Sequence, residues 1–281
     1  MQAHLVRRAD RDAVLAYLEK DVQENLFLLD MALRHGRRPA PGEMRTELAV
    51  ATRAGDIVGV AGLRPSVVFD AAVEPEAVTA FIPFLETLGV GLVKSGVAAV
   101  DQVWGELQRR SPRSVILDRH EIVYTLHPGQ EVLVEPEPGV CVRPAAVDDL
   151  EALVVAARES LREEGRPDPF AGDVRSFRRW VRGRVPRARV VEQRGRIAFV
   201  GYADVQRPEG WLIQGVYTWP ELRGRGLAQA GVSDLCRDAF VQGGSHVQLA
   251  VVEGNAPGIA LYEKLGFKAT GRLRTILFTD G

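Results

Sequence analysis

The sequence predicts two successive domains of the α/β (α+β) class, each with a central sheet flanked by helices. Three observations support this prediction: the length of the chain, a proline-rich connector near its middle, and a weak repeat of one strand-helix pattern. A chain of 281 residues is long for one compact domain and ordinary for two of about 100 to 150 residues. Apolar residues make up 46% and charged residues 26% of the chain, as in proteins that bury a normal core.

The repeat and the connector set the expected domain boundaries. Val6 corresponds to Val142 and Asp12 to Asp148, and in each copy a short strand runs into a helix with an acidic first turn. We infer a duplication. Between the copies, residues 127–139 contain three prolines among acidic residues, which favours an extended connector over a helix. We therefore expect a first domain at 1–130, a linker at 131–138 and a second domain at 139–281.

Hydrophobic periodicity and turn residues predict the elements of each domain. In the second half we expect, in order, a strand at 140–143, helices at 148–163 and 174–184, strands at 189–193, 197–206 and 211–218, a helix through 228–239, a strand at 246–252, a short helix, and a strand at 273–278. In the first half we expect a strand at 4–8, helices to about residue 35, strands at 47–52 and 57–63, helices at 75–88 and 100–110, and a strand within 114–126.

Composition excludes several classes of protein. No run approaches the ~18 apolar residues that would span a bilayer, and the N-terminus has no apolar signal region, so we expect a cytoplasmic protein without membrane contact. The two cysteines, Cys141 and Cys236, lack the spacing of a disulfide framework or a zinc site. We expect reduced, buried thiols and no metal.

The net charge of −1 divides unevenly between the halves. Residues 1–138 carry 15 Lys and Arg against 20 Asp and Glu, which gives −5, and residues 139–281 carry 21 against 17, which gives +4. The basic second half favours an anionic ligand. Neither charge is extreme enough to indicate nucleic-acid binding.

A glycine-rich turn in the second half combines the features of an anion site. The expected strand at 211–218 leads into Arg223-Gly-Arg-Gly-Leu-Ala228, which opens a helix. Glycines let backbone N–H groups converge on an anion, the helix N-terminus attracts negative charge, and the two arginines could bond phosphate. The spacing is neither GxxxxGK[ST] nor GxGxxG. On these residues alone, a plain helix start with solvated arginines is an equally good interpretation.

Two longer segments resemble motifs of the GNAT acetyltransferase superfamily. Val216 to Ala228 is similar to its motif A, with the core Q/R-x-x-G-x-G/A, and Asn255 to Phe267 is similar to its motif B. The resemblance covers most of residues 139–281 and only the outline of the first half. It implies two GNAT-like domains, each with a mixed, mostly antiparallel central sheet, and an acetyl-CoA-dependent N-acetyltransferase of the direct-attack type. The acceptor would be a primary amine of a small molecule or a protein lysine, and the protein a monomer or homodimer.

The resemblance also implies roles for individual residues. The turn would bind the coenzyme A pyrophosphate, and the strand before it would pair with the pantetheine arm. The residues implied to bind the cofactor are Val216, Tyr217, Thr218, Arg223, Gly224, Arg225, Gly226, Leu227, Ala228 and Asn255. Gly215 fits a bulge that splays this strand from the next. Asn255 also has a purely local explanation as a helix cap.

The catalytic residues we expect are Tyr262, which the resemblance implies, and Glu253, which is a candidate by its position. Tyr262 would donate a proton to the departing thiolate, which suits a phenol of ordinary pKa about 10; a core aromatic is the alternative. The general base is open. Many relatives have a glutamate on the strand at 211–218, where this chain has Gln214. Glu253, Asp204 and Glu159 are candidates by position.

Two further features bear on function. The loop at 159–173 is rich in carboxylates and would favour a cationic acceptor, unless it is simply a solvated loop. The first half has Val73-Glu-Pro-Glu-Ala-Val78 where a glycine turn would enter a helix, so it resembles a degenerate repeat, with one cofactor per chain. Two alternatives remain open: a non-catalytic acyl-CoA sensor, and a tandem-GNAT transferase that forms an amide in cofactor biosynthesis.

Overall fold

The structure is a computed structural model that describes residues 1–39 and 43–280 and divides into two compact units. Unit 1 consists of Met1–Pro39, Met44–Ile122 and the C-terminal segment that starts at Gly271, and unit 2 consists mainly of Val123–Thr270. The return of the chain to unit 1 at Gly271 is a feature that no sequence pattern indicated. The linker at 131–138 stays a prediction.

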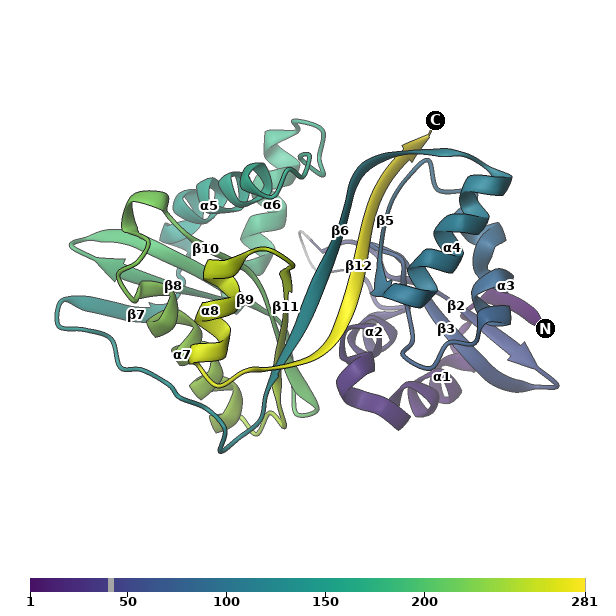
Figure 1. Cartoon of the computed structure of the whole chain (residues 1–281), viewed down its shortest axis with the longest axis horizontal. Helices are drawn as coiled ribbons and strands as arrows, with labels where there is room; N and C mark the ends of the chain where they lie inside the picture. Colours follow the sequence, from purple (N-terminus) through teal and green to yellow (C-terminus); the bar gives the residue numbers. More distant parts are fainter. Residues whose placement is uncertain (40–42, 281) are drawn as a thin grey trace. The chain divides into compact units, whose positions relative to one another are not determined.

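Unit 1 contains an antiparallel sheet in the order β1-β2-β3-β4 and a second group of strands in the order β5-β12-β6. Its elements are β1 (Gln2–Leu5), α1 (Arg11–Leu18), α2 (Val22–Arg34), β2 (Glu47–Arg53), β3 (Asp56–Arg64), β4 (Val68–Phe69), α3 (Pro75–Leu85), β5 (Val90–Gly96), α4 (Val97–Arg110), β6 (Arg113–Leu126) and β12 (Lys268–Asp280) (Figure 1). The end of β6, from Val123, and the start of β12 belong to unit 2. Strand β12 pairs antiparallel with β5 from Leu273 to Thr279.

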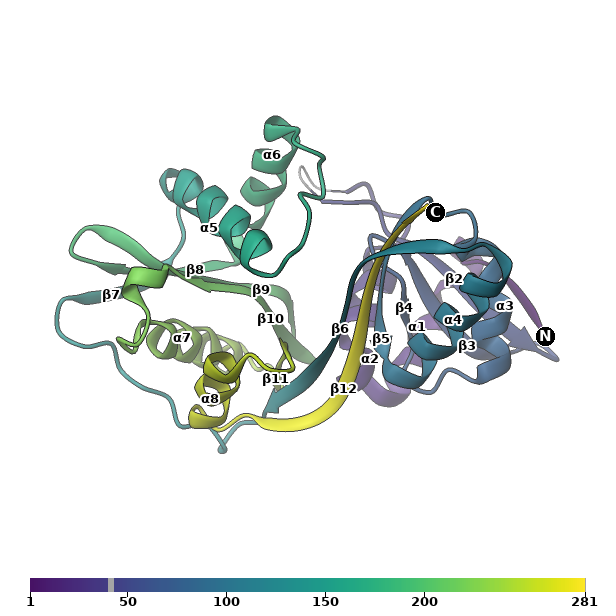
Figure 2. The same ribbon diagram turned by 45° about the horizontal axis from the view of Figure 1, so that its top comes forward.

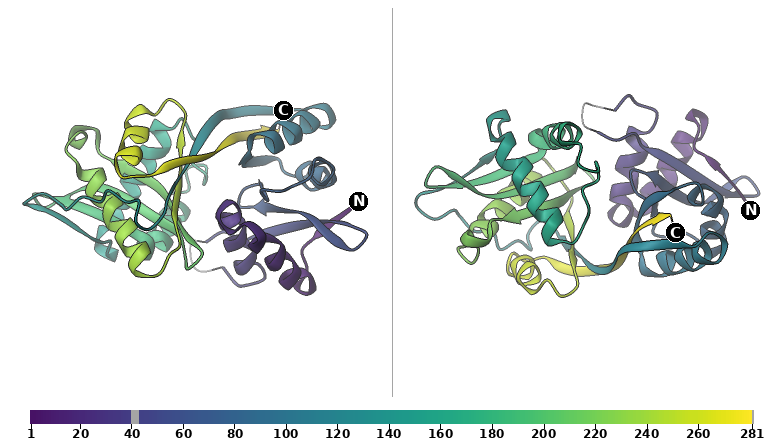
Figure 3. Two further views of the ribbon diagram at one scale, coloured as in Figure 1. Left: turned by 60° about the horizontal axis from the view of Figure 1, so that its bottom comes forward. Right: turned by 90° about the horizontal axis from the view of Figure 1, so that it is seen from above.

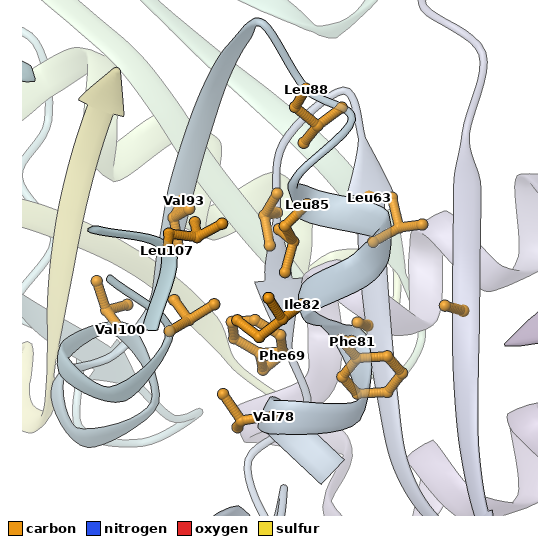
Figure 4. Close-up of a cluster of buried hydrophobic side chains, with 14 of the residues drawn as sticks. Leu63, Phe69, Val78, Phe81, Ile82, Leu85, Leu88, Val93, Val100 and Leu107 are labelled. Atoms are coloured by element: carbon orange, nitrogen blue, oxygen red, sulfur yellow. The ribbon is translucent and has the colours of Figure 1, made fainter. Parts of the chain in front are cut away.

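Alternation along β2 explains why helices cover both faces of the first sheet. Leu48 and Val50 pack with α1 and α2, whereas Ala49 and Ala51 pack with α3 and α4, as the period of two along a strand requires. Figure 3 shows α1 and α2 together against this sheet. Figure 4 shows the larger core, in which side chains of α3, α4 and β5 surround Phe69.

Unit 2 is built on five strands in the order β11-β10-β9-β8-β7, with the end of β6 next to β11. Its elements are β7 (Val140–Pro144), α5 (Leu150–Glu163), α6 (Val174–Arg184), β8 (Ala188–Gln193), β9 (Arg196–Arg207), β10 (Gly210–Thr218), α7 (Leu227–Val241), β11 (Val247–Val252) and α8 (Ala256–Lys264). The pairs β7-β8, β8-β9 and β9-β10 are antiparallel, and β10-β11 is parallel.

Helices lie on both faces of this sheet, α5 and α6 on one side and α7 and α8 on the other (Figure 2). Val200 and Tyr202 on β9 pack with α5 and α6. Phe199, one residue earlier, faces α7, where a Cβ on Gly231 would come within 2.3 Å of its ring. Glycine at this position therefore lets the helix lie close to the sheet.

The predicted fold class, mixed and mostly antiparallel sheets flanked by helices, is confirmed, and most predicted elements agree to within two residues. Strand β1 ends at Leu5, earlier than expected, because the backbone N–H of Arg7 bonds the Asp10 carboxylate, which closes a helical turn. Strands β4 and β5 were not predicted. The expectation of two buried thiols is wrong for Cys141, which is exposed on the edge strand β7; Cys236 is buried.

Candidate functional site

The glycine turn lies between the end of β10 and the start of α7, as predicted. Gly224 and Gly226 have φ angles of +72° and +73°, a backbone conformation that other residues rarely adopt. A Cβ on Gly224 would meet nothing within 4 Å, so glycine serves the backbone conformation and an open surface here. Residues Arg223 to Gly226 are exposed, and Leu227 is buried and anchors the start of the helix.

The backbone N–H groups from Gly224 to Ala228 have no partner within residues 1–39 and 43–280. The first helical bond of α7 runs from the N–H of Ala230 to the carbonyl of Gly226, and the N–H of Arg223 bonds Pro220. Among the described residues, no acceptor faces the N–H groups from Gly224 to Ala228. Several free N–H groups at the start of a 15-residue helix are a candidate anion-binding site, because they and the helix dipole attract negative charge.

The two arginines of the turn are held by different partners. The Arg223 guanidinium bonds both oxygens of Glu163, at 2.8 and 2.7 Å, and its Nε bonds the carbonyl of Thr218 at 2.9 Å. Arg225 bonds the carbonyl of Glu221 at 3.0 Å. The Arg223–Glu163 ion pair is partly exposed and therefore contributes at most about 1 kcal/mol, so an anion can compete for Arg223.

Strand β10 carries the predicted bulge. Gly215, at φ +60°, and Val216 both lie between the paired residues Gln214–Tyr202 and Tyr217–Val200, opposite a single residue of β9. On its other side, β10 pairs with β11 only at Trp211 and Leu212. The described strands therefore separate toward Thr218, and this edge of β10 presents backbone groups that an extended ligand could pair with. Val216, Tyr217 and Thr218 lie on this segment.

Helix α8 places the residues of the second motif. The Asn255 side chain accepts a hydrogen bond from the N–H of Gly258 at 3.1 Å, so its predicted capping role is confirmed. Tyr262 is 7% exposed, and its ring lies against those of Tyr124 and Phe267. Burial, with a smaller effect of Cys236, raises the pKa of Tyr262 above its ordinary value. The phenol is therefore protonated at neutral pH.

The candidates for the general base occupy different environments. Asp204 bonds Arg184 through both oxygens, and Glu159 bonds Arg162 on the same helix. Glu253 is exposed in the connection between β11 and α8. Because the carboxyl ends of parallel strands meet at one edge of a sheet, this connection lies at the same edge as the turn after β10.

The carboxylates of the loop at 159–173 are engaged locally. Glu163 bonds Arg223, Glu164 pairs with Arg166, and Asp168 accepts from two backbone N–H groups of its own loop. Asp173 caps α6. These carboxylates therefore serve capping and ion pairing, and the field they offer a cation is weaker than their number suggested.

A polar cluster on unit 2, which the sequence did not indicate, is formed by Arg184, Asp204 and Tyr202. Arg184 ends α6, and its side chain is only 11% exposed. Its guanidinium carbon lies 3.8 Å from the centre of the Tyr202 ring. No sequence signal could have joined it to a strand 20 residues away.

Unit 1 has no comparable turn before its helix α3. The N–H of Ala71 bonds the Asn25 side chain at 2.9 Å, and that of Ala72 bonds the Asp70 carboxylate at 3.1 Å. The Asp70 carboxylate also accepts from the N–H of Val60. Glu74 stands at the N-cap position of α3, and its carboxylate bonds Arg53 at 2.6 Å. The side chains of Asn25 and Asp70 thus take two backbone N–H groups of the segment before α3, where unit 2 has its glycine turn.

Other classes of site find no support in the described ranges. Within residues 1–39 and 43–280, no three His, Cys, Asp or Glu side chains are grouped so that they could hold a metal. None of the helices there has the length and apolarity needed to cross a membrane.

Comparisons with known proteins agree with this geometry. Residues 153–267 match the acetyltransferase (GNAT) family. The fold of the whole chain is similar to that of a Drosophila protein (TM-score 0.73, 13% identity, covering 99% of this chain and 98% of that one). It is also similar to a GCN5-related N-acetyltransferase from Sphaerobacter thermophilus (TM-score 0.63, 17% identity, 98% and 94% covered). A third similar structure is a tandem GNAT protein from the clavulanic acid biosynthesis pathway (TM-score 0.57, 14% identity, 100% and 99% covered). No curated protein matches the chain in sequence.

Proposed function

We propose that this chain is an N-acyltransferase that moves the acetyl group of acetyl-CoA to a primary amine. The match of residues 153–267 to the acetyltransferase (GNAT) family supports this proposal. The amine belongs to a small molecule or to a protein lysine. The observation that carries the proposal is the run of N–H groups from Gly224 to Ala228 without a partner in the described part of the chain, beside the edge of β10 that separates from β11.

The residues of unit 2 offer the charge and the hydrogen-bonding groups that coenzyme A needs. The N–H groups of the turn would hold the pyrophosphate, and glycine at 224 and 226 leaves that space free of a Cβ. Arg225 would add charge-assisted bonds. The pantetheine arm carries amide groups, which would pair with the backbone from Val216 to Thr218 as an added strand does. Leu227 and Asn255 border this path from the starts of α7 and α8.

Acetyl-CoA would supply an acetyl thioester, which an amine can attack directly. Side chains and backbone groups of the chain would then transfer the protons and stabilise the negative charge that forms. Tyr262 is buried and protonated and would give its proton to the leaving thiolate. A backbone N–H of the separating segment of β10 would stabilise the oxyanion. Glu253 is the residue we assign to accept the amine proton, directly or through water.

Unit 1 supports a stoichiometry of one cofactor per chain. Its corresponding N–H groups bond Asn25 and Asp70, and Glu74 adds a carboxylate that would repel a pyrophosphate. Unit 1 is therefore the degenerate partner of the catalytic unit in this proposal.

An acyl-CoA sensor is the second candidate, because Gln214 stands on the strand where a base would serve. Thiol release from acetyl-CoA, measured against a panel of amines, separates the two functions. Tyr262→Phe should lower kcat about 100-fold or more, the usual contribution of a general acid, with little change in the affinity for CoA. The matched control is Tyr124→Phe, because the Tyr124 hydroxyl bonds Glu263 instead. Tight binding of acetyl-CoA without turnover on any amine would exclude the enzyme and leave the sensor.

A further inference from the structure

The cluster of Arg184, Asp204 and Tyr202 lies on the face of the unit 2 sheet that α5 and α6 cover. Arg184 of α6 bonds Asp204 and lies over the Tyr202 ring, so both β9 side chains are on that face. Arg184 bonds Asp204 at 3.1 Å through Nε and at 2.5 Å through Nη2. The two side chains are 11% and 16% exposed, so the ion pair is largely buried and keeps a small contact with solvent.

The cluster lies directly against the bulge of β10. A Cβ on Gly215 would be 3.1 Å from Cδ2 of Tyr202 and 3.3 Å from Nη2 of Arg184. Gln214, the residue before the bulge, is paired with Tyr202 across the strands. If the pantetheine arm follows β10 from Thr218 toward this bulge, as the proposed function requires, the acyl end of the donor and the incoming acceptor meet beside these side chains.

Both uncommitted polar groups of the cluster are donors. A guanidinium has five N–H donors, and Asp204 takes two of those of Arg184. The Tyr202 hydroxyl is buried and has no partner among the described residues. Burial raises the pKa of Tyr202 to about 12, although Arg184 opposes this shift, so the hydroxyl keeps its proton. A buried donor without an acceptor is unfavourable, and a ligand oxygen would relieve it.

We propose that Arg184, supported by Tyr202, binds a carboxylate of the acceptor, so that the substrate class is small amines with a nearby carboxylate, such as amino acids. Planar guanidinium groups bond carboxylates in a matched, charge-assisted geometry. Asp204 places a negative charge on the same cluster, where it can attract the ammonium form of such an amine before it loses its proton. This inference rests on the proposed function, because that function puts the acceptor at the bulge.

The test compares acceptors that differ only in the carboxylate: glycine with glycinamide, and β-alanine with β-alaninamide. Rates are corrected for the fraction of free amine. For the wild type we expect the carboxylates to have the larger kcat/KM. Arg184→Gln should raise KM for the carboxylates about 10- to 100-fold, the value of a hydrogen bond to a charged group, and should leave the carboxamides almost unchanged. Tyr202→Phe should act in the same direction with a smaller factor.

Two further variants keep the result interpretable. Arg184→Gln leaves Asp204 without its partner and can destabilise unit 2, so the double variant Arg184→Gln with Asp204→Asn, which removes both charges, is assayed with it. Arg178→Gln removes another ion-paired arginine of α6, one bonded to Glu151, and should change neither class of acceptor. Equal use of carboxylates and carboxamides by the wild type would overturn this inference and leave the acyltransferase intact. Turnover on no amine at all would overturn both.

Discussion

Replacing Gly226 by glutamate should abolish cofactor binding without unfolding the chain. Gly226 caps α7 at φ +73°, so any other residue there costs about 1 to 2 kcal/mol. The nearest group to an added Cβ is the Gln229 side chain at 3.7 Å, so no clash inside the protein adds to this cost. The new carboxylate would lie beside the proposed pyrophosphate.

The loss of affinity follows from Coulomb's law. At a separation of ~5 Å and an effective dielectric constant of ~20, two like unit charges repel by about 3 kcal/mol. This corresponds to a dissociation constant for CoA that is about 100-fold larger or more. Isothermal titration calorimetry with CoA measures this constant directly, and Gly226→Gln separates the effect of charge from that of the side chain's size.

Gly195→Glu is the matched control. Gly195 lies in the exposed turn between β8 and β9 at φ +71°, with nothing within 4 Å of an added Cβ. The two variants should therefore lose similar stability in thermal unfolding, while only Gly226→Glu loses CoA binding. Equal CoA affinities for the two variants would refute the assignment of the turn as the pyrophosphate-binding site.

Two further predictions concern ion pairs. Glu163→Gln should strengthen CoA binding several-fold, because the Glu163 carboxylate competes with phosphate for Arg223; an unchanged dissociation constant would place Arg223 outside the phosphate site. In unit 1, burial would raise the pKa of Glu121, but Lys94 and a second cation outweigh burial and lower it to about 2. A folded pKa below the ordinary 4.5 means that this stabilisation, about 3 kcal/mol, is present above pH 4.5 and is lost as the pH falls toward 2. Urea unfolding at several pH values should therefore show that Glu121→Gln is less stable than wild type at pH 7 and as stable as wild type near pH 2. A difference in stability that does not depend on pH would contradict the lowered pKa of Glu121.

The sequence predicted best the features that local chemistry determines. The glycine turn, the bulge at Gly215 and the cap at Asn255 each depend on a backbone conformation or a hydrogen bond within a few residues. These features agree with the structure. The same holds for α6, whose predicted and observed bounds coincide.

Features that depend on distant partners could not be predicted. Strand β5 was not predicted, and its Gly91 is needed where the Phe278 ring of β12 lies 2.5 Å from an added Cβ. The pairing of β12 with β5 joins residues more than 170 positions apart. The contact of Glu163 with Arg223 likewise crosses from α5 to the turn, although the loop composition had suggested a role for this carboxylate toward the acceptor.

The central claim is that the backbone of residues 224–228 binds the pyrophosphate of coenzyme A. A titration of the full chain with CoA, followed through its backbone amide NMR signals, tests this claim most directly. We predict saturable shifts of the Gly224, Gly226 and Leu227 amides at one CoA per chain, with the Ala71 and Ala72 amides of unit 1 unchanged. Binding that shifts the unit 1 amides, or that leaves the turn's amides unmoved, would contradict the account.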